Sequence, residues 1–285
     1  MKNRSHLWKG IAAVSVFLIA ACAPANDSSS SVAASATASC AKADLKTLAP
    51  GKLTIATGQP AYYPWIIDDK PETGQGFEGA LAYAVANELG FTNAEVSWVR
   101  TTFDSAVTPG AKNFDFNLQQ YTITDERKKA VDFSSPYYTT PQAIVSYKGS
   151  KIDGKTSIAD LKNAKLGAGV GTTSLDAITN VIGGTPQVFN DNAAAVAALK
   201  NGQIDGFVAD LPTIFYLAGV EVKDGIIVGQ LPLSGTGDNF GLLLSKDNPL
   251  TSCVTKAVDS LRSSGKLAEI TAKWLGTDAG APVLK

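Results

Sequence analysis

One polar segment of the sequence, QQYTITDER from Gln119 to Arg127, contains the side chains best suited to chemistry. It places amide and hydroxyl groups a few residues before an arginine, and arginine is scarce, with only Arg100, Arg127 and Arg262 after residue 22. A guanidinium offers planar, paired donors that match a carboxylate, especially beside hydroxyl and amide groups. The segment therefore predicts a site that binds a carboxylate.

Arg127 also has a simpler interpretation, as a surface residue of a short helix. Thr124 is well placed to cap that helix, because a threonine oxygen can accept one of the first free backbone N–H groups. The guanidinium would then pair with Asp125 or Asp132, an arrangement that contributes little to stability when it is exposed. Both roles remain open from these residues alone.

Asp210 is a second candidate binding residue. It follows a nearly continuous apolar run, residues 204–209, of the kind found in a parallel strand that is buried on both faces. Ligands of α/β proteins bind at the carboxyl ends of such strands, where Asp210 would stand. Aspartate is also a favoured helix cap, so Asp210 could instead begin a helix at Leu211. The two roles are compatible.

The elements that would position these residues follow an alternating pattern from Lys52 onward. Short apolar runs alternate with segments of helical periodicity, which is typical of an α/β fold. A first unit begins with a strand at 52–56 and an aromatic loop at 57–65. A second unit is expected after residue 139, and the last helices return to the first unit.

Composition places the chain among ordinary globular proteins. Its 285 residues are 45% hydrophobic and 18% charged, which is enough to bury one or two hydrophobic cores. The net charge is −1, and removing residues 1–21 takes away three cations and no acids, which leaves about −4. Neither charge indicates a nucleic-acid partner.

Residues 1–21 have the pattern of an export signal, with three cations followed by an apolar run from Ile11 to Ala21. That run is shorter than a typical membrane-spanning helix. It ends in LIAAC, which resembles a bacterial lipobox, so Cys22 is predicted to be acylated and to become the first mature residue. An ordinary cleaved signal or a short anchor is the alternative. Residues 22–44 are expected to be a disordered tether to a membrane surface.

Two further cysteines, Cys40 and Cys253, lie near the two ends of the expected folded part. In an exported protein such a pair is expected to form a disulfide, although two buried free thiols would also fit. The single histidine, His6, belongs to the signal segment, so we expect no metal site and no cofactor.

A series of short motifs resembles the family-3 extracellular solute-binding proteins, which serve ABC importers of polar amino acids. The resemblance extends over about residues 53–275. In chain order the motifs are YPW at 63–65, GFE at 76–78, TITDER at 122–127 with DFS at 132–134 and PY at 136–137, GTT at 171–173, and GQID at 202–205. Each motif is weak alone, but their order and spacing together are specific.

The resemblance implies a two-lobed α/β structure, the type II periplasmic-binding-protein fold, with two crossover strands as a hinge. Lobe 1 would contain residues 45–139 and 238–277, and lobe 2 would contain residues 140–237. A free amino acid would be held between the two lobes.

The resemblance also implies roles for individual residues. Arg127 is expected to bind the α-carboxylate of the amino acid, and Asp210 its α-ammonium group. Glu78 is expected to be structural or peripheral to the site. The other ligand-binding residues implied are Gln120 and Thr122, Thr172 through its backbone amide at a helix start, and Tyr62 or Trp65 over the apolar part of the ligand.

The sequence departs from the family pattern at positions that influence ligand choice. Gln119 and Gln120 stand where the family often has serine, and Glu78 stands where aspartate is common. Gln59 occupies the position that carries an acid in many binders of basic amino acids. The ligand is therefore expected to be polar or acidic rather than basic.

We therefore predict an extracytoplasmic, lipid-anchored and monomeric protein that binds one amino acid, closes around it and delivers it to an ABC permease. A dehydratase-like enzyme on the same scaffold is less favoured. The mature chain would have no histidine for acid–base chemistry and, with Cys40 and Cys253 bridged, no free thiol as a nucleophile. A ligand-sensing lipoprotein without a transport role is a further alternative.

Overall fold

The computed structural model describes residues 39–233, 237–276 and 280–285, which form one compact unit. The predicted signal peptide, the lipidation site at Cys22 and the tether up to residue 38 lie outside the described residues. None of the described helices is long and apolar enough to cross a membrane.

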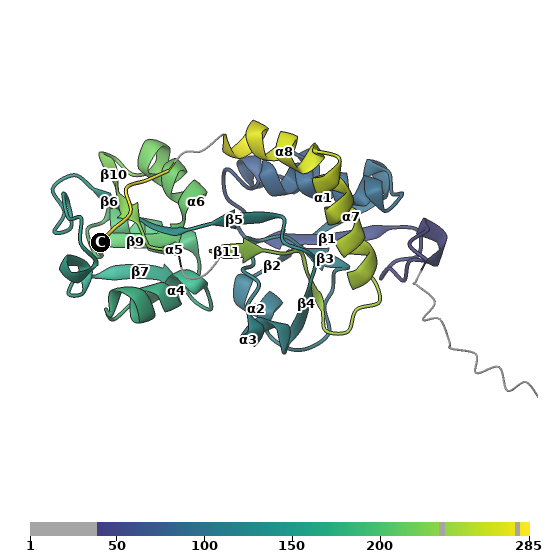
Figure 1. The fold of residues 1–285 in the computed structure, drawn as a ribbon, viewed down its shortest axis with the longest axis horizontal. Helices are drawn as coiled ribbons and strands as arrows, with labels where there is room; N and C mark the ends of the chain where they lie inside the picture. The colour runs from purple at the N-terminus through teal and green to yellow at the C-terminus, as the bar shows by residue number, and fades with distance from the viewer. Residues whose placement is uncertain (1–38, 234–236, 277–279) are drawn as a thin grey trace, which may run out of the picture. The chain divides into compact units, whose positions relative to one another are not determined.

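Two five-stranded sheets form the framework of the described residues (Figure 1). β1 lies parallel to two neighbours in the first sheet and is buried along almost its whole length, because helices cover both faces. Across this sheet the strands are β2 (Val96–Thr101), β1 (Leu53–Gly58), β3 (Phe116–Asn117), β12 (Leu243–Ser245) and β4 (Val131–Phe133), with β12 antiparallel to both β3 and β4.

The helices of the first sheet lie in two groups (Figure 1). One face carries α1 (Phe77–Glu88), α7 (Thr251–Ser263) and α8 (Lys266–Leu275), which enclose a large hydrophobic core. The other face carries α2 (Phe103–Val107) and α3 (Asp125–Lys128) over a smaller core. We call this sheet and its helices the first half.

The second sheet is also mixed, with β6 antiparallel to both of its neighbours. Its strands, in order, are β10 (Gly225–Gln230), β6 (Gln142–Tyr147), β9 (Gly206–Asp210), β7 (Leu166–Gly169) and β8 (Gln187–Phe189). Its helices are α4 (Thr173–Ala177), α5 (Asn192–Lys200) and α6 (Leu211–Tyr216), with π-helical turns at Ile178–Ile182 and Leu217–Glu221. We call these elements the second half.

The helix start predicted at Thr124 is confirmed by its cap. The Thr124 hydroxyl accepts the backbone N–H of Arg127 at 3.1 Å at the beginning of α3. The helix expected after Thr172 is α4, where the Thr172 hydroxyl accepts the N–H of Leu175 at 3.2 Å. Short 3-10 helices complete the structure at Lys42–Asp44, Ile67–Asp69, Pro71–Thr73, Asn93–Glu95 and Ile158–Leu161.

Two short strands connect the halves, as expected from the sequence. β5 (Tyr138–Thr140) leads from the first half into β6, and β11 (Asp238–Phe240) leads back. The two strands pair antiparallel, with Asp238 opposite Thr140. We call β5 and β11 the hinge strands.

The C-terminal residues 280–285 pack against the second half, which the sequence pattern does not indicate. The Leu284 N–H donates to the Gln230 carbonyl, and the Gln230 N–H donates to the Pro282 carbonyl, both at 2.9 Å. Leu284 is 2% exposed and lies among core residues of the second sheet. Because α8 belongs to the first half, the chain passes between the halves three times.

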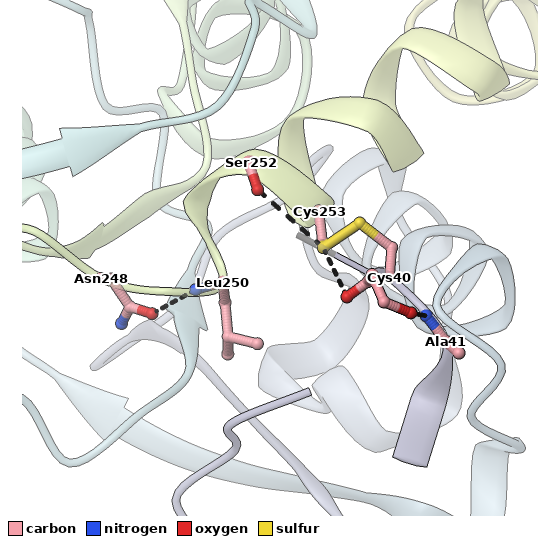
Figure 2. Close-up of a disulfide and its surroundings, with 7 residues drawn as sticks. Cys40, Ala41, Asn248, Leu250, Ser252 and Cys253 are labelled. Carbon is pink, nitrogen blue, oxygen red and sulfur yellow. Dashed lines mark hydrogen bonds between the residues drawn. A yellow bond between two sulfur atoms is a disulfide. The ribbon is translucent and has the colours of Figure 1, made fainter. Parts of the chain in front are cut away.

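A disulfide joins Cys40 to Cys253 in α7, with 5.4 Å between their Cα atoms (Figure 2). The predicted pairing is confirmed, and the free-thiol alternative is wrong. The segment around Cys40 is folded, with a 3-10 helix at Lys42–Asp44 in which Lys42 pairs with Glu95 at 2.7 Å. The predicted tether, 22–44, is therefore too long at its C-terminal end, because the disulfide fixes this segment to α7.

Candidate functional site

A cavity of about 130 Å³ lies between the two halves. Four of the predicted ligand-binding residues line it, namely Tyr62, Gln120, Thr172 and Asp210. The other residues of the lining are Gln59, Pro60, Thr102, Phe103, Gln119, Gly169, Val170, Thr173, Ser174, Asn190, Asp191, Asn192 and Ala209. Most of the lining residues are of polar type, and they include two with carboxylates, Asp191 and Asp210.

Arg127 lies beside this lining and contacts both halves. Its Nη1 atom donates to the Thr122 carbonyl at 2.6 Å, and Nη2 donates to the Gly171 carbonyl at 2.9 Å. The guanidinium also lies over the Phe103 ring, 5.2 Å from its centre. Burial lowers the pKa of Arg127, and the nearby carboxylate of Asp238 opposes that effect.

The surface ion pair considered for Arg127 is not formed. Asp125 pairs with Lys128 and Asp132 pairs with Lys246, each at 3.1 Å. A guanidinium has five N–H donors, and the two carbonyl groups do not use all of them. Arg127 is therefore held in place by backbone oxygens and retains donors for an anion.

Asp210 lies at the end of β9, where its exposed part faces the cavity. Its Oδ1 atom accepts a hydrogen bond from Gln142 Nε2 at 2.6 Å, and it makes no capping bond to α6. Removal of the carboxylate from water raises the pKa of Asp210 to about 8, and the neighbouring Asp238 adds to this effect. Asp210 therefore occupies the N-cap position of α6 without a side-chain cap bond, and its ligand-binding role stays a prediction.

Gln142 and Asp238 belong to the same network, although sequence reasoning missed both. Gln142 Nε2 also donates to Asp238 Oδ2 at 2.6 Å, and Gln142 Oε1 accepts from Ser174 Oγ at 2.5 Å. Only their positions could have indicated this role, since Gln142 closely follows the hinge strand β5 and Asp238 begins the hinge strand β11.

Gln120 reaches the cavity from a strained backbone held by Glu78. Its φ angle is 50°, in the left-handed region that residues other than glycine rarely adopt. Glu78 accepts the Gln120 backbone N–H at 2.8 Å and its side-chain Nε2 at 2.5 Å, and it also accepts the Tyr137 hydroxyl. Glu78 is fully buried and does not line the cavity, so it acts on the site through Gln120.

Threonines from the two halves meet near the cavity. Thr122 Oγ1 and Thr173 Oγ1 are 3.2 Å apart and share a hydrogen bond. Thr122 is buried and does not line the cavity, whereas Thr173, which the sequence reasoning missed, does. The hydroxyl of Thr172 donates to the Gly169 carbonyl at 2.8 Å.

The two predicted aromatic residues have different positions. Tyr62 lines the cavity, and its hydroxyl accepts the Ala193 N–H of the second half at 3.0 Å. Trp65 is 1% exposed, packs in the core of the first half and does not line the cavity. Its indole N–H donates to Thr213 Oγ1 of the second half at 2.9 Å. Phe103, which the sequence reasoning missed, is the second aromatic residue of the lining.

The site therefore combines a carboxylate in the cavity lining, from Asp210, with the guanidinium of Arg127 beside that lining. No group of three or more His, Cys, Asp or Glu residues that could hold a metal ion occurs among the described residues. The arrangement suits a small molecule that carries both an anionic and a cationic group.

Comparisons with known proteins agree with this chemistry. Residues 53–277 match the model of the bacterial extracellular solute-binding proteins, family 3. An L-arginine-binding protein of Pseudomonas aeruginosa is 29% identical over 252 residues, covering 82% of this chain and 92% of the relative. The L-cystine-binding protein TcyJ of Escherichia coli is 31% identical, covering 79% of this chain and 84% of the relative.

Solved structures extend the comparison to the whole arrangement of elements. An ancestral arginine-binding protein bound to glutamine is 32% identical and superposes with a TM-score of 0.68. The match covers 79% of this chain and 98% of that protein.

Proposed function

Because this chain belongs to the bacterial extracellular solute-binding proteins of family 3 and has their type II periplasmic-binding-protein fold, we propose that it captures one free polar amino acid. The cavity between the halves is the proposed site. The observation that carries the proposal is the pairing of Arg127 beside this cavity with Asp210 in its wall. The relatives are named as binding proteins, in agreement with the expectation that the chain is not an enzyme.

In this proposal Arg127 binds the ligand carboxylate with its remaining N–H donors. The Thr122 hydroxyl, the backbone amide of Thr172 and the side-chain amide of Gln120 assist Arg127. The Asp210 carboxylate accepts hydrogen bonds from the ligand ammonium group. Tyr62 covers the apolar part of the ligand. A zwitterion fits because each of its charges meets an opposite, largely desolvated charge, and leaving either partner alone would cost about 2–5 kcal/mol.

The lining favours a neutral polar side chain over an acidic one. It includes side-chain amides of Gln59, Gln119, Gln120, Asn190 and Asn192, which can donate and accept hydrogen bonds. No Lys, Arg or His occurs among its described residues, and Asp191 would repel an acidic ligand. Of the polar and acidic classes expected from the sequence, we therefore propose the polar class, with an amide such as glutamine as its simplest member.

We propose that the two halves are the two lobes, with residues 45–139 and 238–277 in lobe 1 and residues 140–237 in lobe 2, to which we add residues 280–285. The hinge strands are the natural place for the lobes to move. A ligand that contacts both lobes stabilises the closed arrangement, because those contacts exist only there. Direct contacts between the halves, among them those of Tyr62, Trp65 and Arg127 and the Thr122–Thr173 pair, would form with closure.

We further propose that residues 1–21 direct export, that acylated Cys22 anchors the protein to the cell membrane, and that the closed form delivers its ligand to an ABC permease. A ligand-sensing lipoprotein is the second candidate. Deleting the gene distinguishes the two, since a transport protein is required for uptake of the ligand and a sensor is not.

Calorimetry on the full-length chain tests the ligand assignment. The protein is purified in detergent, then unfolded and refolded to remove any carried-over ligand, and titrated with each common L-amino acid. We expect one-to-one binding of a polar amino acid. Absence of binding by every amino acid would overturn the proposal.

A further inference from the structure

A single side-chain amide connects two acidic residues next to the proposed ligand site. Gln142 Nε2 donates to Asp210 Oδ1 and to Asp238 Oδ2, each at 2.6 Å. A primary amide has two N–H donors, so both are used. Ser174 Oγ donates to the other end of the amide at 2.5 Å, which fixes which way it points. We call Asp210, Gln142 and Asp238 the amide bridge.

The amide bridge lies where both hinge strands meet the second sheet. Gln142 is the first residue of β6 and follows β5 after one intervening residue. Asp238 is the first residue of β11, opposite Thr140 of β5. Asp210 pairs in register with Gln142 across β6 and β9, and it also lines the cavity. The bridge thus touches the ligand cavity and both hinge strands.

The bridge also balances unfavourable charges. Two carboxylates held by one amide repel each other, and burial adds to that cost. Asp210 is also affected by the negative charge of Glu78 and the positive charge of Arg127, and its own charge helps to raise the pKa of Tyr137 and Tyr138. Burial raises the pKa of both acids, and donation by Gln142 and attraction to Arg127 oppose that rise.

We propose that Gln142 and Asp238 are positioning residues for ligand capture: Gln142 holds the Asp210 carboxylate at the cavity, and Asp238 joins Gln142 to the second hinge strand. This inference rests on the proposed function. Its physical reason is that a protonated Asp210 is neutral and cannot form the ion pair, so the groups that control its proton control affinity.

Two substitutions should shift the proton of Asp210 in opposite directions. Asp238→Asn keeps an oxygen that can accept from Gln142 but removes the repelling charge, so Asp210 should lose its proton at a lower pH. Gln142→Leu removes both donors, so Asp210 should keep its proton to a higher pH. Ser146→Ala is the matched control, because Ser146 is a buried polar residue of the same strand that bonds to the Asp205 carbonyl at 2.6 Å instead.

The experiment uses the full-length chain in detergent and has two readouts. The first is the carboxyl ¹³C titration of the aspartates in the ligand-free protein. The second is the affinity for L-glutamine by calorimetry across the range of about pH 5.5 to 8.5, where the ligand ammonium group keeps its proton and the affinity of the unaltered protein should rise by up to about tenfold per pH unit until Asp210 is ionised.

In the Asp238→Asn protein, we expect the Asp210 titration and the affinity plateau to move down by about one pH unit. In the Gln142→Leu protein both should move up, with affinity at pH 7 reduced by about tenfold or more. The inference is overturned if both variants titrate like Ser146→Ala or move in the same direction. Failure of the proposed function would look different, since the unaltered protein would then bind no amino acid.

Discussion

At the level of single residues, the cavity is surrounded by more carboxylates than cations. Glu78, Asp210 and Asp238 lie near it, and Arg127 is the cation that acts on the two aspartates among the described residues. Burial raises the free energy of each unpaired charge. Ligand affinity should therefore depend on which of these acids are protonated and on which anion pairs with Arg127. Two substitutions test these contributions separately.

Arg127→Ala is expected to abolish measurable amino-acid binding, because the ligand carboxylate would lose its paired donors in a desolvated site. The expected loss is about 2–5 kcal/mol, or roughly 30-fold to several thousand-fold in affinity. Calorimetry measures the affinity, and circular dichroism checks that the protein remains folded. Arg262→Ala is the matched control, since Arg262 pairs with Asp259 on the surface. Micromolar binding by the Arg127→Ala protein would contradict the assigned role.

Glu78→Gln is expected to flatten the pH dependence of stability. Burial raises the pKa of Glu78 to about 7 from an ordinary value of 4.5. Between these pH values the folded state holds a proton that the unfolded state has released. This proton therefore stabilises the folded state fully below the ordinary pKa of Glu78. The stabilisation is lost as the pH rises through the pKa of the folded state, which lowers the free energy of unfolding by about 3 kcal/mol.

Urea unfolding of the wild-type and Glu78→Gln proteins at several pH values between about 5 and 8 measures this effect. The raised pKa values of Asp210 and Asp238 add a slope of the same sign in both proteins. Because the Glu78 charge also raises the pKa of Asp210, the difference between the two curves measures Glu78 together with its effect on Asp210. Two parallel curves would refute the predicted contribution.

At the level of secondary-structure elements, local sequence signals predict where helices and strands begin and end. They do not predict contacts between residues that are far apart in the sequence. The start of α3 follows from Thr124, and the end of β9 follows from the apolar run before Asp210, because a few neighbouring residues determine each. The Gln142–Asp238 contact joins residues 96 positions apart, and no local pattern marks it. The order and spacing of the motifs predict the two-lobed fold, which no local pattern does, because relatives with the same motifs share one tertiary arrangement.

The loop between β1 and α1 shows the same limit within the site. Tyr62 and Trp65 are both aromatic and close in sequence, yet Tyr62 lines the cavity and Trp65 is buried in the core. Neighbouring side chains of an irregular loop follow no fixed period, so the direction of each depends on tertiary packing. Sequence reasoning could name the loop as part of the site but could not choose between its aromatic residues.

Leu284→Ala tests whether the C-terminal segment, residues 280–285, stabilises the second half. Leu284 fills the core beside β10 and would leave a cavity, so the free energy of unfolding should fall by about 2 kcal/mol or more. Val283→Ala is the matched control, because Val283 is 51% exposed and should change stability by less than about 0.5 kcal/mol. Urea unfolding gives both values, and equal effects would show that the segment does not contribute to the core.

At the level of the whole molecule, the covalent and non-covalent links have different consequences for motion. The disulfide lies entirely within the first half, so it constrains the unfolded chain without crossing the hinge strands. The side-chain contacts that do cross are non-covalent, such as the hydrogen bonds of Trp65 to Thr213 and of Ala193 to Tyr62 and the ring contact of Tyr63 with Tyr216, and each can break and reform. Opening and closing should therefore depend on the ligand and leave the core of each half intact.

Trp65 should report this motion through its fluorescence. Its indole N–H bonds to Thr213 of the other half, so opening would remove that partner and admit water, and ligand binding should shift the emission to shorter wavelength. Trp65→Phe should remove the shift. Trp98→Phe should retain it, because Trp98 bonds to Tyr83 within the first half at 3.2 Å. A shift that survives unchanged in Trp65→Phe would come from another tryptophan and would contradict the prediction that opening exposes Trp65 by breaking its contact with Thr213.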